Sequence, residues 1–285
     1  MLTEEQLLKF NKEGFLIIEN FLTNEICDKL KNESDKLLKM LTGKIEYTEN
    51  DTTIPNPAVF SNEQESYQYM FDSEFKISYF LDSNQKIVNK LGHAVHRNHL
   101  FKQITFSTGI QLIAEQLGFI DPVVLQSMII FKLPGSEELG SHRDDTFLYT
   151  EPSKTLGFWI ALEDVYEDNS CLEFIPGSHL NNDNPVRWSR VGDKMKFVKH
   201  SKQFTDNKSL LDSKQFTRLT KATCPKGSLI LIHGEVIHKS AGNSSDKSRY
   251  AYTFHIIETC NTVFPETNWL SGKGDKLFSN YNESS

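Results

Sequence analysis

The pattern of hydrophobic positions along the chain changes character near residue 121. Before that point, apolar residues recur at the three- and four-residue spacing of amphipathic helices, and we expect helices over about 3–13 and 23–41. Each begins with a capping threonine, and the first has the sequence of a capping box. The apolar run 15–18 between them predicts a short strand. The polar segment from about 42 to 72 predicts a long loop, and helix is expected again within 86–117.

After Pro122 the pattern is that of strands. Runs rich in β-branched and aromatic residues predict strands over 123–131, 156–162, 171–175, 227–232 and 250–257. Helices first and many strands later predict an α+β chain that is mainly β, with a sandwich or jelly-roll core. We expect a single domain over 1–285, divided into a helical N-terminal portion of about 1–121, a jelly-roll core of about 122–260 and a polar insertion or lid of about 180–216.

Composition and charge exclude several classes of protein. Of the 285 residues, 38% are hydrophobic and 24% are charged, and no apolar run approaches the roughly 20 residues that span a bilayer. A net charge of −7 argues against binding nucleic acid by bulk attraction to phosphates. The four cysteines lie far apart without a Cys-x-x-Cys pair, which argues against a zinc knuckle or a redox motif. Neither a secretory signal nor a C-terminal Ser-Lys-Leu is evident, so we expect a cytoplasmic protein, with the nucleus left open. A monomer is the default expectation.

The candidate chemistry lies in the strand-rich part of the chain. His142 and Asp144 stand two residues apart, so their side chains share one face if the backbone is extended. With His238 from far along the chain they would form the two-histidine, one-carboxylate triad of non-haem Fe(II). If the segments around His238 and Arg249 are antiparallel neighbours, the guanidinium and the hydroxyl of Ser240 lie on the same face. Such a pair would hold a second carboxylate, and 2-oxoglutarate is the natural occupant.

Seven stretches of the chain carry a resemblance to a known family. They run over most of the sequence and are 89–96, 126–128, 142–144, 147–152, 174–179, 233–240 and 248–255. In these stretches the chain resembles the phytanoyl-CoA dioxygenase family. The resemblance is far more specific than a single His-x-Asp pair.

The resemblance implies a double-stranded β-helix, a cupin-like jelly roll, with Fe(II) bound by His142, Asp144 and His238. It also implies that the cosubstrate 2-oxoglutarate is contacted by Lys90, Met128, Trp159, Ser240 and Arg249. The activity implied is hydroxylation or a related oxidation of a small-molecule or acyl-CoA-like substrate by O2, with 2-oxoglutarate converted to succinate and CO2 and with ascorbate in support. One departure is Arg143, where the family commonly has Gln, and its side chain should point away from the metal.

The same residues also admit structural explanations. His142 and Asp144 could be surface loop residues and His238 a core histidine. Arg249 could pair with Glu235 or Asp246, Lys90 could be a solvated helix lysine, and Met128 and Trp159 could be core residues. The remaining histidines are expected to be structural, and they are His93, His96, His99, His179, His233 and His255. Of these, His255 is expected to lie nearest the pocket.

Two other functions stay open at this stage. One is a jelly roll that binds a metal or ligand without turnover. The other is a zinc hydrolase, although no general base stands clearly beside the proposed ligands.

The insertion adds a separate hypothesis. In an otherwise acidic protein, residues 187–202 contain six basic residues and a single acid, Asp193. The basic residues are Arg187, Arg190, Lys194, Lys196, Lys199 and Lys202. This segment could be a lid that receives an anionic substrate, such as the phosphates of an acyl-CoA. The alternative is a solvated loop without a binding role.

Overall fold

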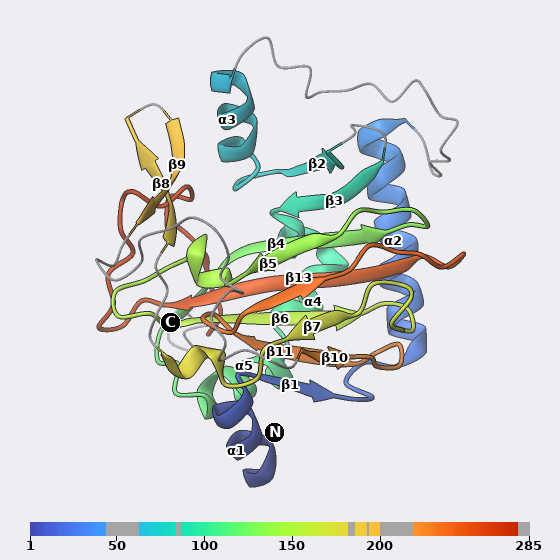
Figure 1. Ribbon diagram of the computed structural model, residues 1–285, viewed down its shortest axis with the longest axis horizontal. Coiled ribbons are helices and arrows are strands. Elements are labelled where there is room, and N and C mark those ends of the chain that lie inside the picture. The colour runs from blue at the N-terminus through green and yellow to red at the C-terminus, as the bar shows by residue number, and fades with distance from the viewer. Residues whose placement is uncertain (44–62, 84–86, 182–185, 193, 200–218, 279–285) are drawn as a thin grey trace, which may run out of the picture.

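Two antiparallel β-sheets face one another in the computed structural model, which describes residues 1–43, 63–83, 87–181, 186–192, 194–199 and 219–278. The large sheet has eight strands in the order β1-β11-β6-β13-β4-β3-β2, with β14 paired to β4, and the small sheet has the order β10-β7-β12-β5 (Figure 1). The strands of the large sheet are β1 (Phe15–Ile18), β2 (Ile77–Leu81), β3 (Val88–His93), β4 (Pro122–Lys132), β6 (Thr155–Ala161), β11 (Leu229–His233), β13 (Arg249–Glu258) and β14 (Asp275–Lys276). Those of the small sheet are β5 (Leu139–His142), β7 (Leu172–Phe174), β10 (Thr220–Ala222) and β12 (His238–Ser240).

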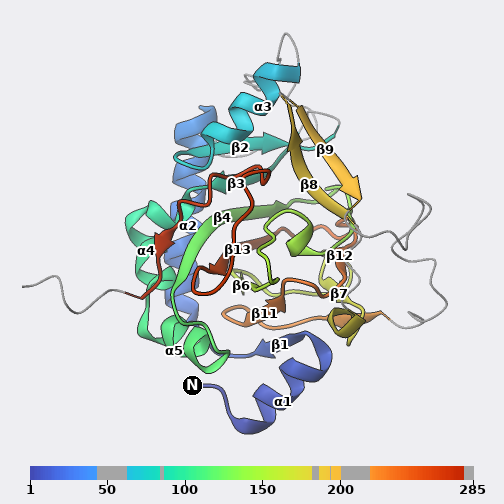
Figure 2. The same cartoon turned by 90° about the vertical axis from the view of Figure 1, so that its left-hand side faces the viewer.

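Helices cover the outer face of the large sheet. Figure 2 shows α2 (Asn24–Thr42), α4 (His99–Thr105) and α5 (Thr108–Gln116) on the side of this sheet opposite to the small sheet. The predicted capping box of α1 (Glu4–Glu13) is present, and the helix ends at Gly14, whose φ of 81° is the left-handed conformation that glycine tolerates. The helices expected over about 3–13 and 23–41, and the strand expected over 15–18, are confirmed as α1, α2 and β1.

The central strand β13 shows how the sequence divides the two faces. Four of its even-numbered residues, Tyr250, Tyr252, Phe254 and Ile256, belong to the large core cluster under the helices. Ala251 instead belongs to the smaller cluster between the sheets. Because side chains alternate along a strand, the odd-numbered positions Arg249, Thr253 and His255 also face the small sheet. Polar side chains thus enter the space between the sheets from the middle of the fold.

The region before residue 121 holds more strand than the sequence predicts. Helix α3 (Glu63–Asp72) lies in the expected loop, β3 lies in the expected helical segment, and β2 lies between them where no element is expected. Residues 44–62 of that loop lie outside the described residues. Lys90 is in β3 and not on a helix, because pairing with both β2 and β4 stabilises an extended backbone in this segment. The three histidines at three-residue spacing consequently do not share a helical face, since His93 ends β3, His96 lies in the 3-10 helix η1 (Val95–Arg97) and His99 begins α4.

The insertion contains a hairpin of β8 (Val186–Val191) and β9 (Lys194–Lys199), which lies beside α3 in both views (Figures 1 and 2). Residues 200–216 of the expected insertion lie outside the described residues. The predicted fold class, α+β and mainly β with a jelly-roll core, is confirmed. In the part of the chain that is described, no helix combines the length and apolar character needed to cross a membrane.

Candidate metal centre and active site

Three side chains converge at one end of the small sheet. His142 ends β5, His238 begins β12, and these two residues are directly opposite each other in the strand pairing. Asp144 follows in the 3-10 helix η2 (Asp144–Thr146). The Nε2 atoms of His142 and His238 each lie 3.7 Å from Asp144 Oδ1, and one ligand atom from each residue lies within 4.8 Å of the others. This is the arrangement that a single metal ion bound by two imidazoles and one carboxylate requires.

The hydrogen bonds of the two histidines orient them for this role. His142 Nδ1 lies 3.0 Å from the carbonyl of Gly140, and His238 Nδ1 lies 3.1 Å from the carbonyl of Val236. A carbonyl can only accept, so each Nδ1 carries the proton and each Nε2 keeps its lone pair. Both lone pairs are therefore available on the side that faces Asp144, which is the donor set that suits a divalent transition metal.

The second oxygen of Asp144 is held from the large sheet. His255 Nε2 lies 3.2 Å from Asp144 Oδ2, although without the geometry of a hydrogen bond, and His255 Nδ1 is 3.3 Å from Gln126 Nε2. Gly157 leaves the room for this contact, because a Cβ at that position would lie 3.2 Å from Asp144 Oδ2. His255 is thus near the site, as expected.

The protonation states also favour metal binding. Burial lowers the pKa of His142 to about 4, and the neighbouring His238 adds to the effect. Burial by itself would raise the pKa of Asp144, but the imidazoles of His255 and His238 outweigh it, so this pKa falls below its ordinary value. At neutral pH the carboxylate is ionised and the His142 imidazole is neutral, which are the forms that bind metals.

A cavity of about 660 Å³ opens beside the ligands. Its apolar wall includes Met70 of α3, Trp188 of β8 and Trp269, and its inner wall includes Lys90 and Met128. Lys90 Nζ lies 5.0 Å from the centre of the Phe80 ring, and burial lowers the pKa of this lysine to about 8. The structure therefore brings two of the predicted 2-oxoglutarate contacts to the cavity that His142 and Asp144 also line.

The other three predicted contacts lie together between the sheets. Arg249 is 1% exposed, donates from Nη2 to the carbonyl of Ser170 at 3.1 Å and lies 3.5 Å from Ser240 Oγ. Its guanidinium carbon is 5.2 Å from the centre of the Trp159 ring. Its Nε and Nη1 have no hydrogen-bond partner, and among the described residues it forms no ion pair, including none with Glu235 or Asp246. A buried cation with unsatisfied donors suits a bound carboxylate.

The geometry that brings Arg249 to Ser240 differs from the sequence prediction. Strands β12 and β13 are not neighbours in one sheet, because β12 belongs to the small sheet and β13 to the large one. Arg249 instead reaches Ser240 across the space between the sheets. The predicted proximity is correct and the predicted pairing is wrong.

Two arginines of the basic insertion are engaged in structural contacts. Arg187 is buried, with Nη1 3.5 Å from Asp145 Oδ2 and its guanidinium over the Tyr149 ring at 4.6 Å. Arg190 donates to the carbonyl of Trp269 at 2.6 Å. Arg187 thus attaches the hairpin to the segment that carries Asp144, and Arg190 attaches it to Trp269, so both arginines have a structural role. Lys202 lies outside the described residues.

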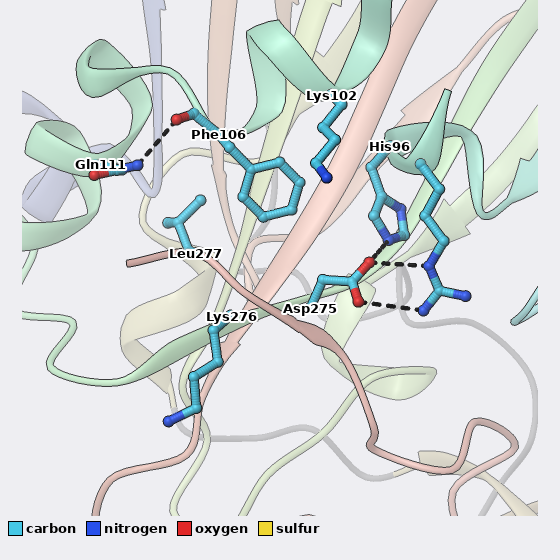
Figure 3. A pocket seen from close by; sticks show the side chains of 8 residues that line it. His96, Lys102, Phe106, Gln111, Asp275, Lys276 and Leu277 are labelled. Atoms are coloured by element: carbon cyan, nitrogen blue, oxygen red, sulfur yellow. Dashed lines mark hydrogen bonds and ion pairs between the residues drawn. The ribbon is translucent and has the colours of Figure 1, made fainter. Parts of the chain in front are cut away.

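A second cavity, of about 540 Å³, lies on the helix side of the large sheet (Figure 3). Its one carboxylate, Asp275, already accepts from Arg97 Nε at 2.9 Å and contacts His96 Nε2 at 3.0 Å. Within the described ranges, only the His142, Asp144 and His238 set has the geometry of a metal site. The first cavity is therefore the candidate active site.

Comparison with known proteins identifies the family. The sequence matches the phytanoyl-CoA dioxygenase (PhyH) family over residues 10–251. The chain belongs to this family. It is 38% identical to phytanoyl-CoA dioxygenase domain-containing protein 1 of Danio rerio, over 98% of this chain and 98% of that protein. It is 34% identical to phytanoyl-CoA dioxygenase of Arabidopsis thaliana, over 94% of this chain and 93% of that protein.

Solved structures agree with the family at the level of the fold. EctD from S. alaskensis, in a structure with 2-oxoglutarate and 5-hydroxyectoine, superposes with a TM-score of 0.65 at 15% identity, covering 96% of this chain and 85% of that one. The non-heme alpha ketoglutarate dependent carbocyclase SnoK gives a TM-score of 0.64 at 18% identity, covering 92% and 86%. The cupin-like jelly roll of this PhyH chain is therefore a fold found among oxygenases of this kind.

Proposed function

We propose that this protein is an Fe(II)- and 2-oxoglutarate-dependent dioxygenase that oxidises a small molecule, with the whole chain acting as one dioxygenase domain. The observation that carries the proposal is the convergence of His142 Nε2, His238 Nε2 and Asp144 Oδ1 beside a cavity, in a member of the PhyH family. The unsatisfied guanidinium of Arg249 gives independent support, because 2-oxoglutarate has a second carboxylate to place.

Each residue would have a defined task. His142, Asp144 and His238 would hold Fe(II), and the iron would supply the activation of O2 that is coupled to conversion of 2-oxoglutarate to succinate and CO2. Lys90, Met128, Trp159, Ser240 and Arg249 would hold the cosubstrate. The wall formed by Met70, Trp188 and Trp269 would position the substrate and exclude bulk water from the reacting atoms.

The cavity also bears on the substrate. Its apolar wall suits a molecule with a hydrocarbon part, whereas Asp82, Glu137 and Glu138 also line it and would repel a polyphosphate that entered there. An acyl-CoA and the corresponding free carboxylic acid, which carries no polyphosphate, are both candidate substrates. A paired screen of acyl-CoA esters and free acids separates the two classes. The cytoplasmic location and the monomeric state are further predictions.

The first experiment measures succinate formed from 2-oxoglutarate by the purified protein with Fe(II) and ascorbate, without added substrate. We expect slow turnover that Asp144→Ala abolishes, because the carboxylate ligand is lost. Calorimetric titration with Mn(II) and then 2-oxoglutarate covers the case in which turnover needs the true substrate. A protein that bound neither ligand would contradict the proposal, and binding of both without turnover by any substrate would favour a ligand-binding protein. Zn(II)-dependent hydrolysis of esters would favour the hydrolase.

A further inference from the structure

Two buried cations lie directly opposite each other in the large sheet. Arg249 begins β13 and Lys132 ends β4, and the pairing of these strands places the two residues in register. Arg249 is 1% exposed and Lys132 is 7% exposed. Like charges at directly opposite positions on neighbouring strands share a face and destabilise the sheet, and burial makes each charge more costly. The fold therefore retains an arrangement that is unfavourable without an anion.

No carboxylate side chain lies within ion-pair distance of either cation in the part of the chain that is described, although Glu137 and Glu138 act on Lys132 from farther away. Neither residue forms an ion pair there. Glu163, the acid that acts on Arg249, is itself 2.6 Å from Lys31 Nζ and accepts from the backbone N–H of Tyr250 at 2.8 Å. Burial lowers the pKa of Lys132 to about 8, with Arg249 as the next cause. The charge of Arg249 thus acts on Lys132 more strongly than either Glu137 or Glu138 does.

The contacts of Lys132 direct it toward the same place as Arg249. Its ammonium donates to the carbonyls of Glu137 and Ala241, which leaves one of its three N–H donors uncommitted. Ala241 follows Ser240, whose hydroxyl faces Arg249. Lys132 also lines the active-site cavity, and its strand position is directly opposite that of Arg249.

We propose that Lys132 is a second cation of the 2-oxoglutarate site and shares the distal carboxylate of the cosubstrate with Arg249 and Ser240. This inference rests on the proposed function and adds to it a binding residue that no sequence motif marks. A structural role is the rival explanation, since Lys132 also joins the loop at Glu137 to the loop at Ala241.

The test uses two ligands that differ only in the distal carboxylate, 2-oxoglutarate and 2-oxopentanoate. Both present the same 2-oxo acid end. The affinity of each is measured by calorimetry on the Mn(II)-loaded full chain under nitrogen. The variants are Lys132→Met, which removes the charge, Lys132→Arg, which keeps it, and Lys29→Met as a control at an exposed lysine of α2 that is 62% exposed.

We expect Lys132→Met to weaken 2-oxoglutarate binding on the order of ten- to hundredfold, because a charge-assisted hydrogen bond to a buried carboxylate is lost. Binding of 2-oxopentanoate should change little. Lys132→Arg should keep most of the preference for 2-oxoglutarate, and Lys29→Met should match the wild type.

A loss of equal size for both ligands would show a structural role and overturn the inference, as would no loss for either ligand. The Mn(II) affinity of each variant verifies that the metal centre is folded. If Lys132→Met does not fold, Lys132→Gln removes the charge while keeping a donor for the two carbonyls. A wild-type protein that bound 2-oxoglutarate no better than 2-oxopentanoate would refute both the inference and the 2-oxoglutarate part of the proposed function. An unexpected result confined to the Lys132 variants would refute the inference alone.

Discussion

Gly157 offers the sharpest test of how the metal ligands are positioned. It lies in β6 between β11 and β13, and a Cβ added to it would lie 3.2 Å from Asp144 Oδ2, 3.2 Å from Ile232 Cβ and 3.3 Å from His255 Cδ2. Carbon contacts are most favourable at about 3.5–4.0 Å, so Gly157→Ala requires movements of a few tenths of an ångström. Ile232 Cβ is fixed by its strand, so the carboxylate of Asp144 is the group that moves.

The substitution affects two quantities, the affinity for the metal and the stability of the fold. Disturbing the groups that orient a metal ligand costs about 10- to 100-fold in affinity, or about 1.4–2.7 kcal/mol. Replacing glycine by alanine within a strand stabilises the fold by about 0.5–1 kcal/mol. We therefore expect Gly157→Ala to bind Mn(II) at least tenfold more weakly, while its free energy of unfolding without metal stays near the wild-type value.

The assay is calorimetric titration with Mn(II), combined with urea unfolding in the absence of metal. Gly140→Ala is the matched control, since a Cβ at Gly140 meets nothing within 4 Å and the carbonyl that accepts from His142 Nδ1 is retained. If Gly157→Ala and Gly140→Ala bound Mn(II) equally well, the idea that Gly157 makes room for the ligand would be wrong.

Three further predictions concern the hairpin, pH and the metal. Arg187→Met should lower the free energy of unfolding in urea by about 3 kcal/mol, because it leaves the buried Asp145 carboxylate without its cation, and adding Asp145→Asn should recover part of the loss. Burial lowers the pKa of His233 to about 4, so the folded state binds a proton less readily than the unfolded chain. Stability should therefore fall as pH drops from about 6.5 to 4, and a His233→Asn variant with the same slope would contradict this. Mn(II) at 100 times its dissociation constant should add about 2.7 kcal/mol to the free energy of unfolding, and Asp144→Asn should lose most of that gain in the same denaturation assay.

The sequence predicts the parts of this protein that depend on local patterns. Threonine caps and apolar periodicity locate α1 and α2, and β-branched runs locate five strands of the jelly-roll core, which are β4, β6, β7, β11 and β13. The side chains that the structure brings together at the metal centre are those selected from the His-x-Asp spacing and the later histidine. The caps, the runs and the His-x-Asp pair each lie within a few residues of chain, whereas His238 comes from far along it.

What the sequence misses depends on strand register. Nothing near Lys132 marks it, because Arg249 becomes its neighbour only when β4 and β13 pair. Lys90 lies in a segment whose sequence predicts a helix, and pairing with β2 and β4 makes it a strand instead. In the sequence Arg187 is one of six basic residues of the insertion, and only the fold places Asp145, 42 residues away, beside it.

Strand β13 explains why fold and site are coupled. Its even positions place Tyr252 and Phe254 in the core under the helices, and its odd positions place Arg249 and His255 among the predicted cosubstrate and metal groups. A slip of one residue in its register would move every one of these side chains to the opposite face. The apolar burial on one face, which amounts to about 2 kcal/mol for each large side chain, therefore also fixes the register of the polar groups on the other. Those groups are costly to bury, and the aromatic core behind them is what holds them in place until ligands neutralise their charge.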